Sequence, residues 1–398
     1  MKNIGVQSIG IKTPIIREGD DLKKIVVDAV LDATAVYNNG YDFSNDEPYW
    51  YDIQDKDVIG ITESVVARSQ GNYVTINDIV EYLEKMNLTK NLILYSPIMS
   101  RNRFSMILKA FARFADKITI VFEGEYDEQG NPNVGINQFT GVNIQEYYTN
   151  LCNQENCKIE FINNKDVNKL AVVTEDGEQF TTRVKYFFNL NTKRWHGVKF
   201  GETFIDCRCH PGDNKDFKLS DIMSQPMNNI LGYNSEYGLL GCNKATEEKI
   251  KLFPEPTKAQ QLVEEIQREI FNKTGKTVEV MIYGDGCFKD PVGGIWEWAD
   301  PVVSPAYTKG LEGTPNEIKI KAFADDQFKN LNGDELTKAV KNEIKNKDAN
   351  LVGNMASQGT TPRRYVDLLG SLMDLTSGSG DKGTPVVLIK NYFSSYAN

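Results

Sequence analysis

The chain is poor in histidine and cysteine, with two and six of them in 398 residues. Neither His196 nor His210 lies in a nucleophile elbow or an H-E-x-x-H helix, so histidine-centred hydrolysis is poorly supported. Sparse, irregularly spaced cysteines indicate free thiols in a reducing compartment. Cys207-Arg208-Cys209-His210 has metal-ligand residue types, but zinc sites space paired cysteines more widely and add a second pair, which favours an ordinary loop.

Long apolar runs and a net positive charge are also lacking. No run approaches the roughly 20 residues that cross a bilayer, and the first residues lack an apolar leader with a cleavage site. A net charge of −10 disfavours nucleic acid, whose binders neutralise phosphates with clustered Lys and Arg. We therefore expect a cytoplasmic protein that binds neither membrane nor nucleic acid. A small phosphate ligand stays compatible with this charge, because it needs only local N–H groups or one or two cations.

The two best-known nucleotide motifs, G-x-G-x-x-G and G-x-x-x-x-G-K-[ST], do not occur. What the sequence does contain is alternation: residues 58–61, 92–95 and 118–122 are strand-like, and residues 104–114 have helical spacing of apolar side chains. This alternation of strand-like and helical segments is typical of stacked βα units. The predicted fold class is mixed α/β, with mixed sheets, flanking helices and two interlocked lobes, distinct from a Rossmann or P-loop fold.

Further elements follow from periodicity and capping. Asp20 or Asp21 can cap a helix that runs to about residue 37, with Leu22, Val26 and Val30 on its apolar face. The other expected elements are strands at residues 170–173, 184–190, 278–283 and 386–390, and helices at residues 258–272, 335–347 and 365–375. We divide the chain into a core part at residues 1–122, an enlarged substrate lobe at 123–237 and a second core part at 238–398.

The strongest candidate site is the glycine-rich segment at residues 376–385, between an apolar helix and an apolar strand. Such a loop can direct several N–H groups at phosphate oxygens. Lys382 can add a positive charge, and Asp381 or the neighbouring hydroxyls can hold a cation. The alternative interpretation is a flexible surface turn.

Asp285 is the second candidate, because it ends a buried strand and is flanked by glycines. A divalent cation prefers carboxylate oxygens on a rigid platform, although Asp-Gly is also a common hairpin turn. Two weaker candidates also follow strands: Pro14-Ile15-Ile16 before Arg17, and Ser64 with Arg68. Arg68 can clamp a phosphate or carboxylate, or serve as a surface ion-pair partner.

Four blocks, in order, resemble the coenzyme F-420-0:L-glutamate ligases, also called F-420 γ-glutamyl ligases. They are the opening I-G-I-K-T-P-I-I-R-E-G-D-D-L at residues 9–22, the strand and turn at 58–71, the helix, T-G-K turn and strand at 262–288, and the last helix, loop and strand at 367–391. The blocks cover about one third of the chain.

The resemblance implies an amide-bond ligase. In such an enzyme GTP or ATP, with Mg or Mn, activates a small-molecule acceptor carboxylate as an acyl phosphate, and the amine of an amino acid such as L-glutamate then displaces phosphate to form a γ-glutamyl link. It also implies a homodimer and a metal at Asp285. The nucleotide-binding residues carried over by the resemblance are Pro14, Ile15, Ile16, Ser64, Arg68, Gly378, Ser379, Gly380, Asp381, Lys382 and Gly383.

One family pattern is incomplete. The G-I-D-x-S-N metal motif falls on G-L-L-G-C-N at residues 238–243, which lacks the aspartate. A non-catalytic nucleotide-binding or interaction protein on the same scaffold is therefore the alternative. A hydrolase that uses paired carboxylates is a third class that spacing alone leaves open.

Overall fold

The computed structural model falls into two compact units. Unit 1 comprises Met1–Ser69, Pro256–Gly284 and Val302–Asn398, and unit 2 comprises Gln70–Glu255 and Asp285–Pro301. These limits differ from the boundaries after residues 122 and 237, and the expected functional division stays a prediction. The residues that the structure describes are 5–35, 52–86, 88–122, 124–128, 130–163, 171–174, 183–189, 194–197, 201–208, 217–219, 243–285, 288–289, 296–297, 302–357, 364–378 and 380–397.

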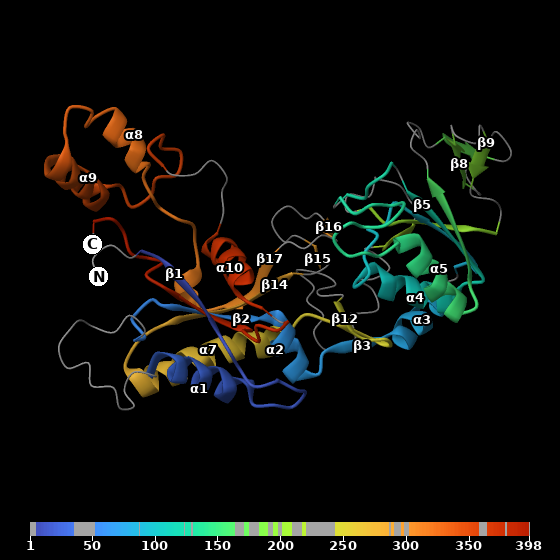
Figure 1. The fold of residues 1–398 in the computed structure, drawn as a ribbon, viewed down its shortest axis with the longest axis horizontal. Coiled ribbons are helices and arrows are strands. Elements are labelled where there is room, and N and C mark those ends of the chain that lie inside the picture. The colour runs from blue at the N-terminus through green and yellow to red at the C-terminus, as the bar shows by residue number, and fades with distance from the viewer. Residues whose placement is uncertain are drawn as a thin grey trace. The chain divides into compact units, whose positions relative to one another are not determined.

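Unit 1 is built on a five-stranded mixed sheet in the order β1-β18-β2-β14-β17 (Figure 1). The strands are β1 (Gln7–Ile11), β2 (Val58–Thr62), β14 (Glu279–Asp285), β17 (Val302–Tyr307) and β18 (Val386–Lys390). β2 and β14 are parallel, whereas β18 runs antiparallel to β1 and β2. The mixed α/β class expected from the sequence is confirmed.

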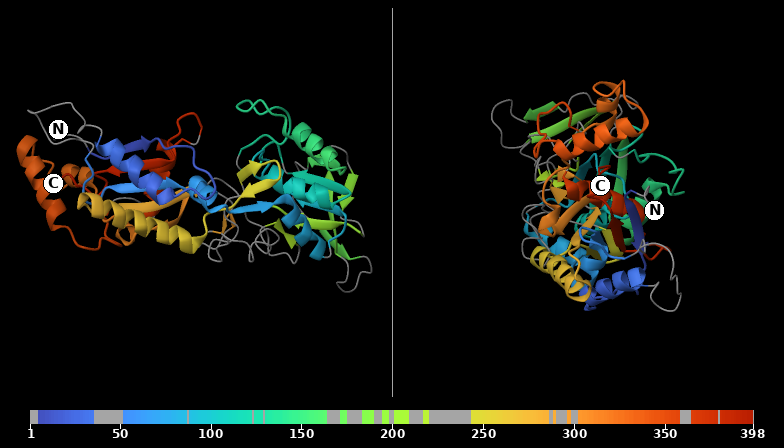
Figure 2. Two further views of the ribbon diagram at one scale, coloured as in Figure 1. Left: turned by 90° about the horizontal axis from the view of Figure 1, so that it is seen from below. Right: turned by 90° about the vertical axis from the view of Figure 1, so that its left-hand side faces the viewer.

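Helices cover both faces of this sheet (Figures 1 and 2). α1 (Leu22–Ala35) and α7 (Pro256–Thr274) pack with Ile59 and Ile61 on one face, and α10 (Tyr365–Thr376) packs with Met281 on the other. Alternate strand residues therefore point to opposite cores, as a two-residue period requires. A Cβ at Gly60 would overlap the sulfur of Met373, so glycine permits this close packing of α10.

The predicted helices and strands of unit 1 agree with the structure within a few residues. Asp21 caps α1, because the backbone N–H of Lys24 donates to its Oδ1 at 3.0 Å. α7 begins at Pro256, a residue that suits the first helical position because it has no N–H to leave unpaired. The remaining elements of this unit are α2 (Glu63–Gln70), η2 (Lys309–Leu311), α8 (Ile320–Asp325) and α9 (Gly333–Asn346).

Unit 2 contains a parallel sheet in the order β11-β10-β4-β5-β6. Its strands are β4 (Asn91–Tyr95), β5 (Lys117–Phe122), β6 (Lys158–Asn163), β10 (Thr203–Asp206) and β11 (Phe217–Lys218), and its helices are α3 (Ile76–Lys85), α4 (Phe104–Phe114) and α5 (Ile144–Gln154). Smaller sheets comprise β12 (Asn243–Thr246), β13 (Lys249–Lys251) and β3 (Tyr73–Thr75); β7 (Ala171–Thr174), β8 (Arg183–Asn189) and β9 (Arg194–Gly197); and β15 (Phe288–Lys289) with β16 (Trp296–Glu297).

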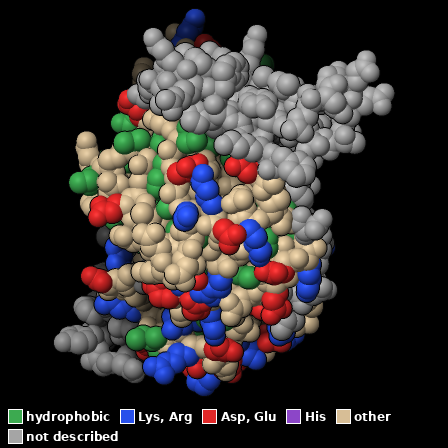
Figure 3. Space-filling model, turned by 90° about the vertical axis from the view of Figure 1, so that its right-hand side faces the viewer, with side chains coloured by type: hydrophobic (Ala, Val, Ile, Leu, Met, Phe, Trp, Pro, Cys, Tyr) green, Lys and Arg blue, Asp and Glu red, His purple; other side chains and the backbone are tan. Residues whose placement is uncertain are grey.

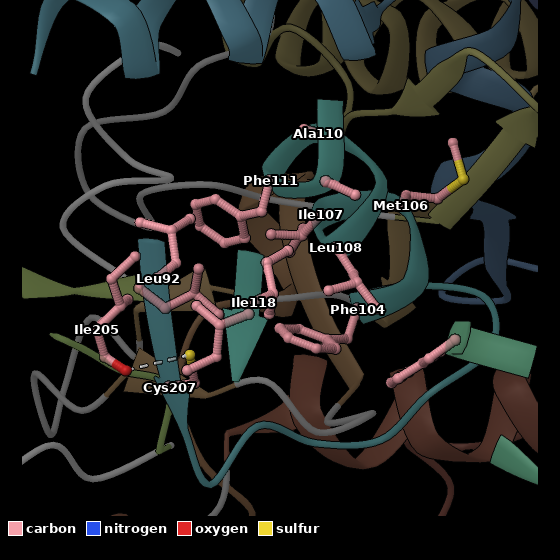
Figure 4. Close-up of a cluster of buried hydrophobic side chains, with 14 of the residues drawn as sticks. Leu92, Phe104, Met106, Ile107, Leu108, Ala110, Phe111, Ile118, Ile205 and Cys207 are labelled. Carbon is pink, nitrogen blue, oxygen red and sulfur yellow. Dashed lines mark hydrogen bonds between the residues drawn. The ribbon is translucent and has the colours of Figure 1, made fainter. Parts of the chain in front are cut away.

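The main core of unit 2 lies between its parallel sheet and helices α3, α4 and α5. α4 is buried along most of its length, and Figure 4 shows its side chains Phe104, Ile107 and Phe111 packed with Leu92 and Ile118 from the strands. On the face of unit 2 shown in Figure 3, the described basic and acidic side chains are interspersed. Of the helices that the structure describes, none has the length and hydropathy to cross a membrane.

Candidate functional site

Four strand termini meet at one end of the unit 1 sheet. Ile61 near the end of β2 pairs with Val386 at the start of β18, and Val386 pairs with Ile11 at the end of β1. Because β14 runs parallel to β2, with Tyr283 beside Thr62, the unit 1 part of β14 ends here with Gly284, and Asp285 follows it directly in the chain as the first residue of the unit 2 segment. We call this the site end of the sheet, where β1, β2 and β14 end and β18 begins. The four site segments predicted from the sequence are each next to one of these termini. Residues 14–16 follow β1, Ser64 and Arg68 follow β2, Asp285 ends β14, and the glycine-rich loop at residues 376–385 precedes β18.

Backbone hydrogen bonds tie three of the segments together. The N–H of Thr13 donates to the carbonyl of Gly383 at 3.3 Å, and the N–H of Gly19 donates to the carbonyl of Ser69 at 2.9 Å. Residues 14–16 are therefore held between the glycine-rich loop and the end of α2. Within them Ile16 is buried, whereas Ile15 is 80% exposed.

The glycine-rich loop is closed by its own backbone. Gly378 and Thr384 exchange hydrogen bonds of 3.3 and 2.9 Å, and the N–H of Gly383 donates to Gly380 at 3.1 Å. The exposed Asp381 and Lys382 lie at the tip of this turn, and their N–H groups make no hydrogen bond within the described part of the chain. Ser379 lies outside the described residues. The tip thus offers two N–H donors and one ammonium group to an anion.

Two buried hydroxyl groups lie beneath the loop. The oxygens of Tyr283 and Thr384 have no hydrogen-bond partner of normal geometry among the described residues. Burial raises the pKa of Tyr283, an effect that the nearby Ser377 hydroxyl partly offsets, so the phenol remains a neutral donor. Thr384 packs over Gly10 of β1, where a Cβ would lie 3.1 Å from that of the threonine.

Two acidic residues occur in the sequence where neighbouring strands of the sheet end. Asp285 is the last residue of β14, and Glu63 is the first residue of α2, directly after β2. Glu63 is 2% exposed, and a Cβ on Gly284 would overlap its side chain. The stem of Glu63 therefore packs on the backbone one residue before Asp285. Sequence reasoning assigned no role to Glu63, although its position after a buried strand was a usable signal.

Ser64 and Arg68 lie on α2, which starts at the site end. They are four residues apart and therefore share one face of the helix. Ser64 is half-buried and Arg68 is exposed. The helix places a hydroxyl close to the strand end and a guanidinium one turn farther from it.

The two remaining sequence patterns belong to unit 2. Cys207 follows β10 in unit 2, where burial raises the pKa of its thiol; Cys209 and His210 lie outside the described residues. The described cysteines Cys152, Cys157 and Cys207 are free. Of the pattern at residues 238–243, only Asn243 is described, as the first residue of β12. Among the described residues no group of three or more His, Cys, Asp or Glu side chains is arranged to hold a metal ion.

A family model matches most of the chain. The model of the family described as F420-0:Gamma-glutamyl ligase matches residues 10–391. That range covers nearly the whole chain, including every segment at the site end. No curated protein matches the chain significantly.

Proposed function

The chain belongs to the F420-0:gamma-glutamyl ligase family, and we propose that it is a GTP- or ATP-dependent ligase that joins an amino acid such as L-glutamate to an acceptor carboxylate. The observation that carries this proposal is the convergence of the four segments at the site end of the sheet. Distant parts of the sequence thereby supply N–H donors, cations and the carboxylate of Glu63 to one end of the sheet. Phosphoryl transfer requires these groups, because its catalysis consists mainly of positioning and charge stabilisation.

In this proposal the glycine-rich loop holds the nucleotide phosphates. The N–H groups of Asp381 and Lys382, at the tip of the loop, make no hydrogen bond to another described residue. The side chain of Lys382 lies against Gly378, where a Cβ would overlap it. The methylene groups of Lys382 therefore pack on the loop. Ser64 and Arg68 on α2 provide a hydroxyl and a second cation, and residues 14–16 border the nucleotide.

We assign a divalent cation such as Mg or Mn to the acidic residues Asp285 and Glu63, because a hard cation prefers carboxylate oxygens as ligands. Glu63 would replace the carboxylate that the pattern at residues 238–243 lacks. When bound there, the cation would offset the negative charge on the transferred phosphoryl group. Gly284 is needed because any side chain at that position would displace Glu63.

The residues around the metal site would orient the reactants. Lys382 and Arg68 would hold the phosphate chain so that its terminal group faces the acceptor carboxylate, whose oxygen attacks phosphorus to give an acyl phosphate and a nucleoside diphosphate. The amine then attacks the acyl carbon, the C–O bond to phosphate breaks, and the amine loses a proton as the amide forms. Holding both reactants in line accounts for most of the rate that such a site provides.

The test is phosphate release by the purified protein with GTP or ATP, Mg or Mn, L-glutamate and a panel of carboxylate acceptors. Release should require the amino acid and an acceptor together, and it should fall at least tenfold in Lys382→Met. Lys309→Met is the matched control, because it removes the same charge from an exposed residue of the same unit after β17. Nucleotide binding without turnover in any combination would instead assign the chain to the non-catalytic alternative.

The family also implies a homodimer, and we extend the proposal to it. Light scattering after size-exclusion chromatography should give twice the 44.9 kDa chain mass. A monomer at catalytic concentrations would contradict this part of the proposal and leave the ligase assignment intact.

A further inference from the structure

A Schellman motif ends α5 and brings two cysteines together. Asn156 follows the helix with a φ of 59°, in the left-handed region that the motif requires there. Its N–H donates to the carbonyl of Asn153 at 3.1 Å, and the N–H of Cys157 donates to the carbonyl of Cys152 at 3.0 Å. These two hydrogen bonds define the motif, and the side chains at the positions of Cys152 and Cys157 frequently contact each other in it.

The backbone holds these two cysteines within reach of a disulfide. The N–H···O bond from Cys157 to Cys152 keeps their α-carbons less than about 7 Å apart by covalent geometry alone, and a disulfide spans α-carbons about 4.4–6.8 Å apart. The two thiols are hydrogen-bonded to each other, so the side chains also meet. Both cysteines are free. The end of α5 is therefore prearranged for a bond between the two sulfurs.

The contact makes the two sulfurs chemically unequal. The hydrogen bond from Cys152 lowers the pKa of Cys157, an effect that burial partly offsets. The same contact, together with burial, raises the pKa of Cys152. Because the thiolate is the reactive form of cysteine, Cys157 should react first with an oxidant. Cys152 is then the second thiol, already in contact with the oxidised sulfur.

The pair lies close to the surface of unit 2. Cys152 and Cys157 are 0% and 2% exposed, whereas Asn153, Gln154 and Asn156 in the turn between them are exposed. Helix ends open locally more readily than the core of a domain does. A small peroxide can therefore reach the sulfurs when the last turn opens, and the neighbouring thiol competes with any larger reagent for the oxidised cysteine.

We propose that Cys152 and Cys157 are a modification site, at which a small peroxide forms a reversible disulfide. The Cys157 thiolate attacks a peroxide oxygen, the O–O bond breaks, and a sulfenic acid and hydroxide form. The sulfur of Cys152 then displaces hydroxide from the sulfenic sulfur. The two protons that the thiols release convert both hydroxides into water, so one peroxide is reduced as two thiols are oxidised. The proposal is independent of the ligase site in unit 1.

The test is a peptide map of the full chain after treatment with hydrogen peroxide. The sequence has no Lys or Arg between Lys117 and Lys158, so trypsin releases both cysteines in one peptide, residues 118–158. Peroxide should lower the mass of this peptide by about 2 Da, the two hydrogens lost on disulfide formation, and block its alkylation. Dithiothreitol should restore the original mass and the alkylation of both cysteines.

Cys207 is the matched control for burial. It is 1% exposed, its Sγ donates to the carbonyl of Ile205 at 3.6 Å, and burial raises its pKa. Its thiol should be lost at least about tenfold more slowly than those of the pair. Met355 limits the treatment, because it is 89% exposed and oxidises to the sulfoxide. An unchanged peptide 118–158 at the peroxide concentration that converts Met355 would overturn the proposal, as would equal rates for Cys157 and Cys207.

Two variants separate the roles of the sulfurs. In Cys152→Ala the oxidised Cys157 has no neighbouring thiol, so dimedone should trap its sulfenic acid, whereas the parent should give little adduct. In Cys157→Ala the remaining Cys152 should oxidise at least about tenfold more slowly than the pair does in the parent. Equal dimedone labelling of Cys157 in the parent and in Cys152→Ala would show that the two sulfurs do not join. If either variant fails to fold, the peptide map of the parent still decides the proposal.

Discussion

Lys390 and Asp57 form a buried ion pair that joins β18 to the segment before β2. The Lys390 Nζ lies 2.8 Å from Oδ2 of Asp57, and the two side chains are 5% and 3% exposed. The same ammonium donates to the carbonyl of Asp52, and the carboxylate accepts the N–H of Gln54 at 2.9 Å. The pair therefore fixes the end of the sheet opposite the site end, where β18 ends beside the start of β2.

Lys390→Met should lower the free energy of unfolding by about 3–5 kcal/mol, because it leaves the carboxylate of Asp57 buried without its countercharge. Urea denaturation measures the change. Lys24→Met is the control: it removes an exposed pair with Asp28 on α1 and should cost about 0–1 kcal/mol. A loss below about 1 kcal/mol in Lys390→Met would contradict this assignment of the buried pair.

Gly60 and Met373 should be energetically coupled. Gly60→Ala places a methyl group where the Met373 sulfur lies, which should cost about 1–3 kcal/mol as overpacking. In a Met373→Ala background the same substitution should cost less, because the obstructing side chain is gone. Equal costs in both backgrounds, measured by a double-mutant cycle in urea, would show that the sulfur does not restrict position 60.

Unit 2 should lose stability in acid through Glu248. Hydrogen bonds from Arg113 and Lys109 lower the pKa of Glu248 from its usual 4.5 to about 2. Because the folded pKa is below the unfolded one, this contribution is present above about pH 4.5 and is lost as pH falls toward 2. It is reduced by solvent screening, since the Glu248 side chain is 52% exposed.

Glu248→Gln should therefore flatten the fall of the urea midpoint between pH 4.5 and 2. Glu247→Gln is the neighbouring control, because the Glu247 side chain is 77% exposed. An unchanged pH slope in Glu248→Gln would mean that the carboxylate titrates alike in the folded and unfolded chains.

Elements with strong local signals could be predicted from the sequence. Phe104 and Phe114 bound α4 as expected, since apolar spacing alone defines that helix. Val386 and Lys390 bound the last strand for a similar reason, because a short apolar run between turn residues indicates a buried strand. Capping chemistry likewise predicted that α1 starts after Asp20 or Asp21, and the structure has Asp21 as the cap.

Relationships between distant segments could not be predicted in this way. β10 contains only four residues, Thr203 to Asp206, and nothing in them indicates pairing with β4 rather than β6. The strand order β11-β10-β4-β5-β6 is therefore visible only in the fold. The position of Glu63 directly after a buried strand is a signal in the sequence, whereas its close contact with Gly284 is visible only in the fold.

Glu63→Gln tests the structural basis of the metal proposal without requiring turnover. The substitution keeps the volume of a side chain that is 2% exposed and removes one anionic ligand, so it should weaken Mn²⁺ binding at least about tenfold in paramagnetic resonance titrations. Asp285→Ala should produce a loss of similar size, since both carboxylates would hold the same ion. Glu312→Gln, in the exposed loop after η2, should bind Mn²⁺ as the parent does. A loss in Asp285→Ala with parent-like binding in Glu63→Gln would remove Glu63 from the metal site and leave the missing carboxylate to be found elsewhere in the chain.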